Sequence, residues 1–205
     1  MNLRKALLLL AVATFVTATS HAQFAAYGTF TADHLSNLKS SPEATNPGAL
    51  NNDVSPLGGT GGIYYDFFKV SRLVKLGVDA RGSITTTKRG AFTYANGGGA
   101  RINSGLFGVR AVFNAPFMHT ILRPYIQGSV GIGSSNYGIL YGSGGVSTRS
   151  NFEYMGFAGL DIPLTPYMDF RLVELGAGGL NPFGTDSHNY PLQSVSSGVV
   201  FHLPF

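Results

Sequence analysis

Apolar and polar side chains alternate with a period of two over long stretches of this chain. The clearest example is residues 73–84, where four apolar positions alternate with a glycine and three charges: Val74, Leu76, Val78 and Ala80 against Lys75, Gly77, Asp79 and Arg81. Successive side chains of a β-strand point to opposite faces, so this segment predicts a strand with one apolar and one charged face. Three charges on one face do not suit a strand buried on both sides. The pattern favours lipid on the apolar side and a polar lumen on the other.

Eight segments share this alternation and are predicted as strands: residues 23–35, 59–68, 73–84, 105–114, 121–133, 151–162, 167–177 and 193–205. Long links of roughly 15 to 22 residues alternate with short links of about 4 to 6, as in membrane barrels with long extracellular loops and short periplasmic turns. We therefore predict an all-β fold, a transmembrane eight-stranded antiparallel up-and-down β-barrel. Residues 23–205 form this single domain, with both of its ends in the periplasm.

In two of the predicted strands, the alternation needs a closer look to decide which side chains face inward. In residues 167–177, Asp169 and Arg171 share the polar face, but strict alternation would then turn Glu174 towards lipid. A β-bulge adds one residue to a strand and shifts its phase, so we predict a bulge near residues 173–175. In the second segment, regular alternation predicts that Asp66 and Phe68 both face inward.

The first 22 residues have the pattern of a cleaved secretory signal peptide. Arg4 and Lys5 precede an apolar run from residue 6 to residue 16, and residues 20–22 approximate a small-x-small cleavage site. An apolar run of about 11 residues is too short to cross a bilayer, since a crossing takes roughly 20. We expect cleavage after Ala22 and export.

Composition excludes several other classes of protein. The chain has no cysteine, and therefore no disulfide framework and no thiolate metal site. Its formal net charge is only +4, and it shows no basic stripe, so nucleic acid is not an expected partner. The histidines of residues 23–205 are dispersed along the chain. The glycine clusters at 58–62 and 97–99 do not lead into the helix that a phosphate-binding loop requires. We expect no cofactor and no metal.

The last thirteen residues, 193–205, alternate apolar and small or polar positions and end on an aromatic residue. They resemble the C-terminal signal of bacterial outer-membrane barrels, which is carried here by Gly198, Phe201, Leu203 and Phe205. The whole pattern resembles the eight-stranded outer-membrane barrel superfamily, including the transmembrane domain of outer membrane protein A and its small relatives. The resemblance implies assembly by the barrel assembly machinery and residence in the outer membrane of a Gram-negative cell. The sequence carries no counterpart of the peptidoglycan-binding domain found in outer membrane protein A.

Charged residues on the inward faces predict a blocked lumen. An interior enclosed by eight strands is just wide enough for side chains to fill it. Unpaired charges there would be costly, so we predict an ionic network across the strands. Its members are Asp66, Lys75, Asp79, Arg81, Arg110, Arg123, Glu153, Asp161, Asp169 and Arg171. We expect no wide, constitutive pore.

The outer surface is expected to contact lipid and lipopolysaccharide. Lys88, Arg89, Arg101 and Arg149 lie in loops or at strand ends on the extracellular side, and arginine suits phosphate oxygens. They are candidate lipopolysaccharide contacts, with solvated loop charges as the alternative. We expect an envelope-structural or surface-interaction role through the loops, whose extracellular partner the sequence does not identify.

Two other functions stay open at this stage. Lipid-modifying enzymes also use eight-stranded barrels and need a Ser or His arrangement at one mouth. Adjacency alone does not make Asp186, Ser187 and His188 a triad, and we expect no catalytic residues. A soluble secreted barrel of the lipocalin type would reverse the two faces, with apolar residues inside.

Overall fold

The computed structural model describes residues 23–36, 55–71, 73–87, 101–113, 122–135, 149–183 and 189–203. They form eight strands: β1 (Gln23–Leu35), β2 (Leu57–Lys69), β3 (Val74–Thr86), β4 (Arg101–Phe113), β5 (Arg123–Ser135), β6 (Arg149–Thr165), β7 (Met168–Pro182) and β8 (Tyr190–Leu203). None of the described residues belongs to a helix of the length and apolarity that a membrane crossing needs.

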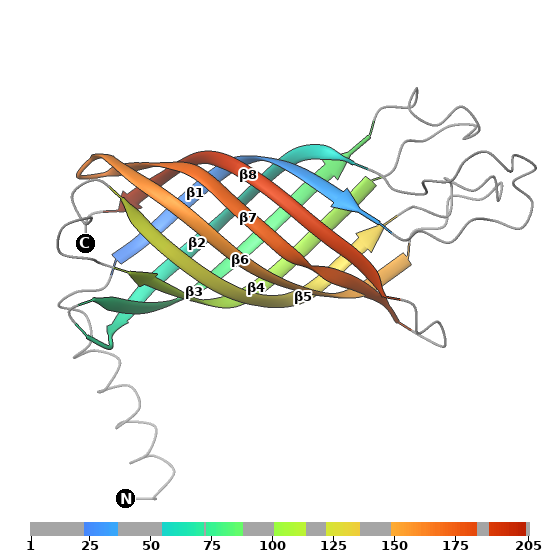
Figure 1. The fold of residues 1–205 in the computed structure, drawn as a ribbon, viewed down its shortest axis with the longest axis horizontal. Helices are drawn as coiled ribbons and strands as arrows, with labels where there is room; N and C mark the ends of the chain where they lie inside the picture. Colours follow the sequence, from blue (N-terminus) through green and yellow to red (C-terminus); the bar gives the residue numbers. More distant parts are fainter. Residues whose placement is uncertain are drawn as a thin grey trace, which may run out of the picture.

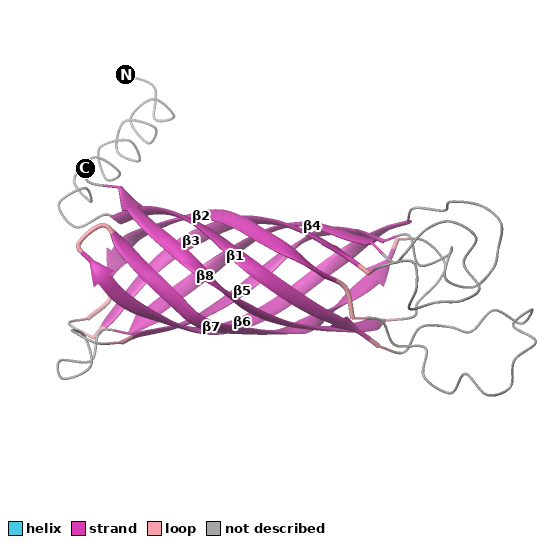
Figure 2. Cartoon of the chain, turned by 90° about the horizontal axis from the view of Figure 1, so that it is seen from above, coloured by secondary structure: helices cyan, strands magenta, loops and turns pink. Residues whose placement is uncertain are grey.

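Each strand pairs antiparallel with its neighbours in the sequence, and β8 pairs with β1 to close the barrel. Figure 1 shows the strands wound obliquely around a common axis, and the second view in Figure 2 shows the same closed wall. We call the end at which β1 begins and β8 ends the turn end, because only residues 166–167 separate β6 from β7 there. The opposite end is the loop end. The predicted fold class, strand number and connectivity are confirmed.

The alternation places apolar side chains outside and polar ones inside. Large exposed hydrophobic residues stand around the wall, among them Phe30, Ile63, Phe107, Val130, Ile132, Leu175 and Phe201. The buried polar and charged residues point into the barrel from the alternate positions of the same strands. This orientation is the reverse of that in a lipocalin-type barrel, so the soluble alternative is wrong. The interior is a packed polar core, and the outside is an apolar belt suited to lipid.

The described strands contain three register irregularities: one in β7, one in β2, and one between Pro163 and Thr165 at the end of β6. The register between β7 and β8 shifts between Arg171 and Glu174, which confirms the predicted bulge and turns Glu174 into the interior, where it is 1% exposed. A second shift lies between Asp66 and Phe68 of β2. Because of it, Phe67 and Phe68 both face outward, 39% and 56% exposed. The prediction that Phe68 points inward is therefore wrong.

Several strands extend further than predicted at the loop end. The fourth strand begins at Arg101 rather than residue 105, and the seventh continues to Pro182 rather than residue 177. These added residues are largely polar or glycine, so they give no apolar alternation. They still join the ladder, because its hydrogen bonds come from backbone groups. The link between β7 and β8 is correspondingly short, residues 183–189.

Candidate functional site: the barrel interior and the loop-end rim

Arg81 of β3 lies at the centre of the interior and joins three other strands. Its guanidinium Nε lies 2.9 Å from Asp79 Oδ1, and its Nη1 lies 2.9 Å from Glu174 Oε1 on β7. Its Nη2 donates to Gln127 Oε1 on β5 at 3.0 Å. The Phe157 ring of β6 lies 4.0 Å from the guanidinium carbon. The planar guanidinium of Arg81 therefore contacts partners on several sides at once.

Arg171 of β7 continues this network towards the turn end. Its Nε lies 2.9 Å from Asp161 Oδ1 on β6, and its Nη1 lies 3.2 Å from Glu174 Oε2. The Tyr125 hydroxyl of β5 donates to the same carboxylate. Glu174 therefore bridges two arginines and a tyrosine. The bulge in β7 is what brings its side chain inside.

Arg110 of β4 is held between a carboxylate and two aromatic rings. Its Nε lies 3.4 Å from Asp66 Oδ1, close enough for an ion pair, although neither atom has a hydrogen-bond partner. Its guanidinium carbon lies 3.6 Å from the centre of the Tyr64 ring and 4.7 Å from that of Tyr125. Cation–π attraction is strongest where water is excluded. The two rings therefore stabilise the Arg110 charge in part, in place of the hydrogen bonds that its Nε lacks.

Asp169 gathers the charges at the turn-end mouth. Its Oδ2 accepts from Arg123 Nη1 at 2.8 Å and lies 2.8 Å from His202 Nε2. Lys75 is half-buried on the inner face of β3, in electrostatic contact with Asp66. Charged side chains from β2, β3, β5, β7 and β8 therefore meet at this end of the interior.

The loop-end half of the interior has a different character. Asp33 accepts from the Thr85 hydroxyl at 2.7 Å, and Asp33, Ser104 and Glu153 line one small cavity. Nearer the loop end lies a buried apolar cap: Leu35, Ile102, Leu180, Tyr190 and Leu192, each at most 3% exposed. Between the cap and the arginine network, a cavity of about 20 Å³ remains. That volume holds about one water molecule.

The structure places all ten residues of the proposed ionic network on inner faces, and joins eight of them in ion pairs: Asp66, Asp79, Arg81, Arg110, Arg123, Asp161, Asp169 and Arg171. Of the other two, Lys75 lies within electrostatic reach of Asp66, and Glu153 lines the same small cavity as Ser104. The predicted network omits two interior carboxylates. Alternation alone places Asp33 on the polar face of the first strand, whereas Glu174 is assigned inward only once the position of the bulge is known.

The proposed assembly residues lie on both faces of β8. Gly198 faces inward, and a Cβ there would come within 2.1 Å of the Gly28 carbonyl oxygen, so this close strand approach requires glycine. Phe201 and Leu203 are exposed on the outer wall, 49% and 43%. Phe205 lies outside the described residues.

The proposed lipopolysaccharide contacts are placed in part. Arg101 begins β4 and is exposed at the loop end, where its Nε donates to Asn103 Oδ1 at 3.1 Å. Arg149 begins β6 at the same end. The structure describes its backbone but not its side chain. Lys88 and Arg89 lie outside the described residues. So do residues 1–22, with the predicted cleavage site. Residues 186–188, which carry Asp, Ser and His, also lie outside them.

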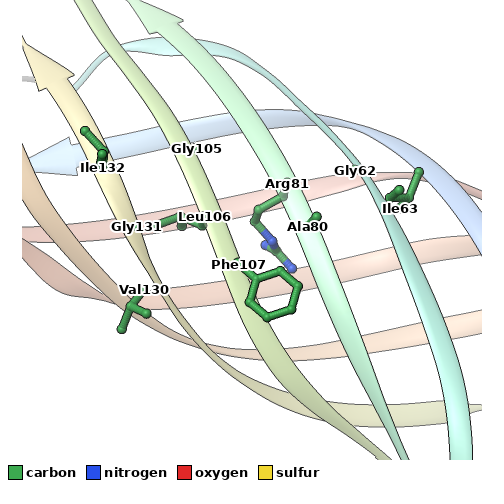
Figure 3. Close-up of a pocket in the computed structure, with 10 residues that line it drawn as sticks. All are labelled: Gly62, Ile63, Ala80, Arg81, Gly105, Leu106, Phe107, Val130, Gly131 and Ile132. Carbon is green, nitrogen blue, oxygen red and sulfur yellow. The ribbon is translucent and has the colours of Figure 1, made fainter. Parts of the chain in front are cut away.

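A shallow apolar hollow, widely open to its surroundings, lies on the outer wall from β2 to β5. Figure 3 shows Ala80 and Phe107 in its middle, with Ile63 on one side and Val130 and Ile132 on the other. Gly105 also lines the hollow, four residues along β4 from Arg101. A cation at the rim and an apolar depression beneath it therefore share one strand.

One pair at the loop end was not foreseen. His34 Nδ1 of β1 lies 3.0 Å from the Ser55 hydroxyl, which just precedes β2. The sequence holds a local His-x-Ser pattern at His34 and Ser36, but the hydroxyl that His34 contacts here belongs to Ser55. His34 and Ser55 meet because β1 and β2 pair, so no local motif predicts their contact. The described residues contain no group of three or more His, Cys, Asp or Glu side chains suited to a metal ion.

No model of a known protein family matches this chain. No curated protein matches it in sequence either. Among solved structures, it is similar to Ail, the attachment invasion locus protein of Yersinia pestis, in complex with the heparin analogue sucrose octasulfate. The TM-score is 0.52 at 10% identity, over 88% of this chain and 99% of Ail.

Neisserial surface protein A is a second structural neighbour, with a TM-score of 0.51 at 12% identity, over 91% of this chain and 100% of that protein. The chain has the fold of the eight-stranded outer-membrane β-barrels. At these identities the likeness establishes the fold alone, and the function of this barrel must be argued from its own residues.

Proposed function

We propose that this barrel resides in the bacterial outer membrane, does not conduct through its lumen, and serves the envelope structurally or through interactions at its loop end. The observation that carries this proposal is the filled interior: arginine–carboxylate pairs at the turn-end half and an apolar cap at the loop end. An eight-stranded wall encloses no more space than these side chains occupy. The loop end is then the part of the molecule free to vary and to recognise a partner.

Export and assembly form part of the proposal. Residues 1–22 would be removed as a signal peptide, and the barrel assembly machinery would recognise the last strand through Gly198, Phe201, Leu203 and Phe205. Deleting Phe205 should reduce the amount of folded protein in the outer-membrane fraction. A deletion variant that assembles as efficiently as the parent would show that the terminal aromatic residue is no signal.

Contact with lipopolysaccharide is supported by the loop-end rim. Arg101 is oriented by Asn103 above an apolar hollow, an arrangement complementary to a phosphorylated sugar that carries acyl chains. Lys88, Arg89 and Arg149 would add phosphate contacts. Neutralising all four should lower the lipopolysaccharide that co-purifies with the barrel, whereas neutralising Lys69, exposed at the turn end, should not. Equal lipopolysaccharide in both variants would remove these contacts from the proposal.

A strain that lacks the gene tests the role in the envelope. The proposal expects unchanged uptake of small hydrophilic solutes, together with altered surface adhesion or altered resistance to detergents. Reduced solute uptake, with adhesion and detergent resistance unchanged, would contradict it and indicate a transport role.

A second candidate function, a lipid-modifying enzyme, is favoured by one observation. The 3.0 Å contact between His34 Nδ1 and the Ser55 hydroxyl has the spacing of a base and the nucleophile it activates. Purified barrel would be incubated with radiolabelled lipopolysaccharide and phospholipid. Acyl release that is lost in both Ser55→Ala and His34→Ala would establish the enzyme, and equal release by parent and variants would exclude this pair.

A further inference from the structure

The bulge in β2 changes the face of the sheet on which Lys69 lies. Phe67 and Phe68 both face outward, so the alternation resumes one residue late, and Lys69 comes directly opposite Lys75 on the inner side of β3. Without the bulge, regular alternation would turn Lys69 to the outer side, away from Lys75. Bulges at the rim of a barrel commonly re-aim a side chain in this way, next to a functional site.

A tight turn fixes these two lysines at the turn end of the barrel. Residues 70–73 separate β2 from β3. Val70 N and Ser71 N donate to the Val74 carbonyl oxygen at 3.1 and 3.3 Å, and Leu73 N donates to Ser71 Oγ at 3.1 Å. Side chains that are directly opposite on antiparallel strands lie close together, and like charges in such a pair repel. The fold therefore holds two ammonium groups near one point against their repulsion.

Arg123 of β5 extends this cluster of positive charge. Arg123 and Lys69 both lie within electrostatic reach of Lys75 and repel it, whereas Asp66 attracts it. Lys69 is exposed and Lys75 is half-buried. The Arg123 side chain is 28% exposed, although its Nη1 pairs with Asp169 at 2.8 Å. We call Lys69, Lys75 and Arg123 the basic rim.

The neighbouring carboxylates do not neutralise the basic rim. Asp33 and Glu153 lie in the loop-end half of the interior, and the rest of the described interior holds five carboxylates against six Lys and Arg: Asp66, Asp79, Asp161, Asp169 and Glu174, against Lys69, Lys75, Arg81, Arg110, Arg123 and Arg171. The difference, six minus five, is one positive charge. His202, which pairs with Asp169, adds a second when it is protonated. Each of the five carboxylates lies in an ion pair with an arginine, so the excess falls on the two lysines.

The outer side of the same turn is apolar. Phe68, Val70 and Leu73 are 56%, 54% and 49% exposed. Apolar side chains beside lysines at the end of a membrane barrel suit the boundary between acyl chains and headgroups, where the ammonium group of a lysine reaches the headgroups. The anion best placed to meet the basic rim is therefore the phosphate of a lipid.

We propose that the basic rim binds the phosphate of one anionic phospholipid in the periplasmic leaflet. The proposal rests on the proposed outer-membrane residence, which places the turn end in that leaflet. A phosphodiester carries one negative charge, which matches the excess of one positive charge. A headgroup without an amine, as in phosphatidylglycerol, keeps that negative charge, whereas the choline of phosphatidylcholine cancels it. The bound lipid would hold the β2–β3 turn at the membrane surface.

The experiment measures lipid binding to the purified barrel. The full chain is produced in a Gram-negative host, purified in a neutral detergent and titrated with phosphatidylglycerol or phosphatidylcholine, and bound lipid per barrel is counted by native mass spectrometry. The parent should bind one phosphatidylglycerol at least about tenfold more tightly than phosphatidylcholine. Lys69→Gln and Lys75→Gln should each weaken the binding of phosphatidylglycerol about fivefold. Lys69→Arg, which keeps the charge, and Arg101→Gln at the loop end should bind it as the parent does.

Equal binding of the two lipids by the parent would overturn the proposal, and so would parent-like affinity in both glutamine variants. Displacement of the lipid by excess inorganic phosphate or by soluble cell-wall fragments would assign the basic rim to another anion and overturn it as well. Should Lys75→Gln fail to fold, Lys69→Gln decides the question, because that side chain is exposed. Fractionation of the same cells tests the outer-membrane residence separately, since binding is measured on purified barrel.

Discussion

At the scale of single residues, Glu174 shows how one backbone irregularity determines chemistry. Regular alternation would expose this carboxylate to lipid, yet the bulge turns it inside, between Arg81 and Arg171. Without Glu174, Arg171 would keep only Asp161 among its ion-pair partners. Side chains in this interior therefore find partners both in their own strand, as Arg81 does in Asp79, and across the barrel, as Arg81 does in Glu174.

Arg110 gives the sharpest prediction at this scale. Arg110→Ala leaves Asp66 buried, 6% exposed, with its ion pair broken, and removes the cation that lies over the Tyr64 and Tyr125 rings. Removal of one partner of a buried pair costs roughly 3 to 5 kcal/mol, and less where water enters. We expect the free energy of unfolding in urea to fall by about that amount. Arg101→Ala at the exposed rim should change it by less than about 0.5 kcal/mol. Equal stability of the two variants would contradict the role given to Arg110.

At the scale of elements, the bulge in β7 yields a paired prediction. Leu172 and Val173 together oppose Ser197 of β8, so β7 carries one residue more than its partner needs. Deleting Val173 would make the ladder regular and still leave Arg171 and Glu174 facing inward. Deleting Leu175 would instead reverse the faces of the residues that follow, and turn Leu180 from the interior to the lipid side.

We therefore expect the Val173 deletion to yield folded barrel and the Leu175 deletion to fail. The measurement is the shift in gel mobility between unheated and heated samples, which separates folded from unfolded barrel. Success of both deletions would show that the inward pattern of β7 does not control assembly.

The sequence predicts strand existence well and strand ends poorly. Alternation identifies all eight strands because lipid and lumen impose opposite demands on successive residues. It does not reach the first residues of β4 or the last of β7, where Arg101 and Gly178–Pro182 extend beyond the apolar belt. It misses the second bulge because Phe67 and Phe68 are both apolar, so no charge marks the change of phase.

Pairs across the lumen could not be predicted from the sequence. Inward position follows from alternation, so the ten network residues could be named in advance. Which arginine meets which carboxylate depends on how the strands are staggered around the barrel, and that stagger is a property of the closed sheet. The same reason hid the contact between His34 and Ser55 and the small cavity that Asp33 and Glu153 share.

At the scale of the whole molecule, the barrel combines an apolar outer wall with an interior into which large polar and apolar side chains point along the described strands. Charged pairs occupy the turn-end half, the small cavity of Asp33 and Glu153 follows, and an apolar cap lies at the loop end. A pore of this strand number would need an interior of small side chains, but arginines and aromatic rings occupy it here. We therefore propose that the lumen is closed.

Planar-bilayer recording of the purified, unmutated barrel tests that claim most directly. The filled interior predicts a quiet bilayer without large, steady single-channel steps, in the same conditions in which a known porin conducts. Arg110→Ala serves as a comparison, since loss of that side chain opens space beside Asp66 and should raise ion leakage above that of the parent. Large, long-lived conductance steps from the unmutated protein would contradict the account and show an open path through the interior.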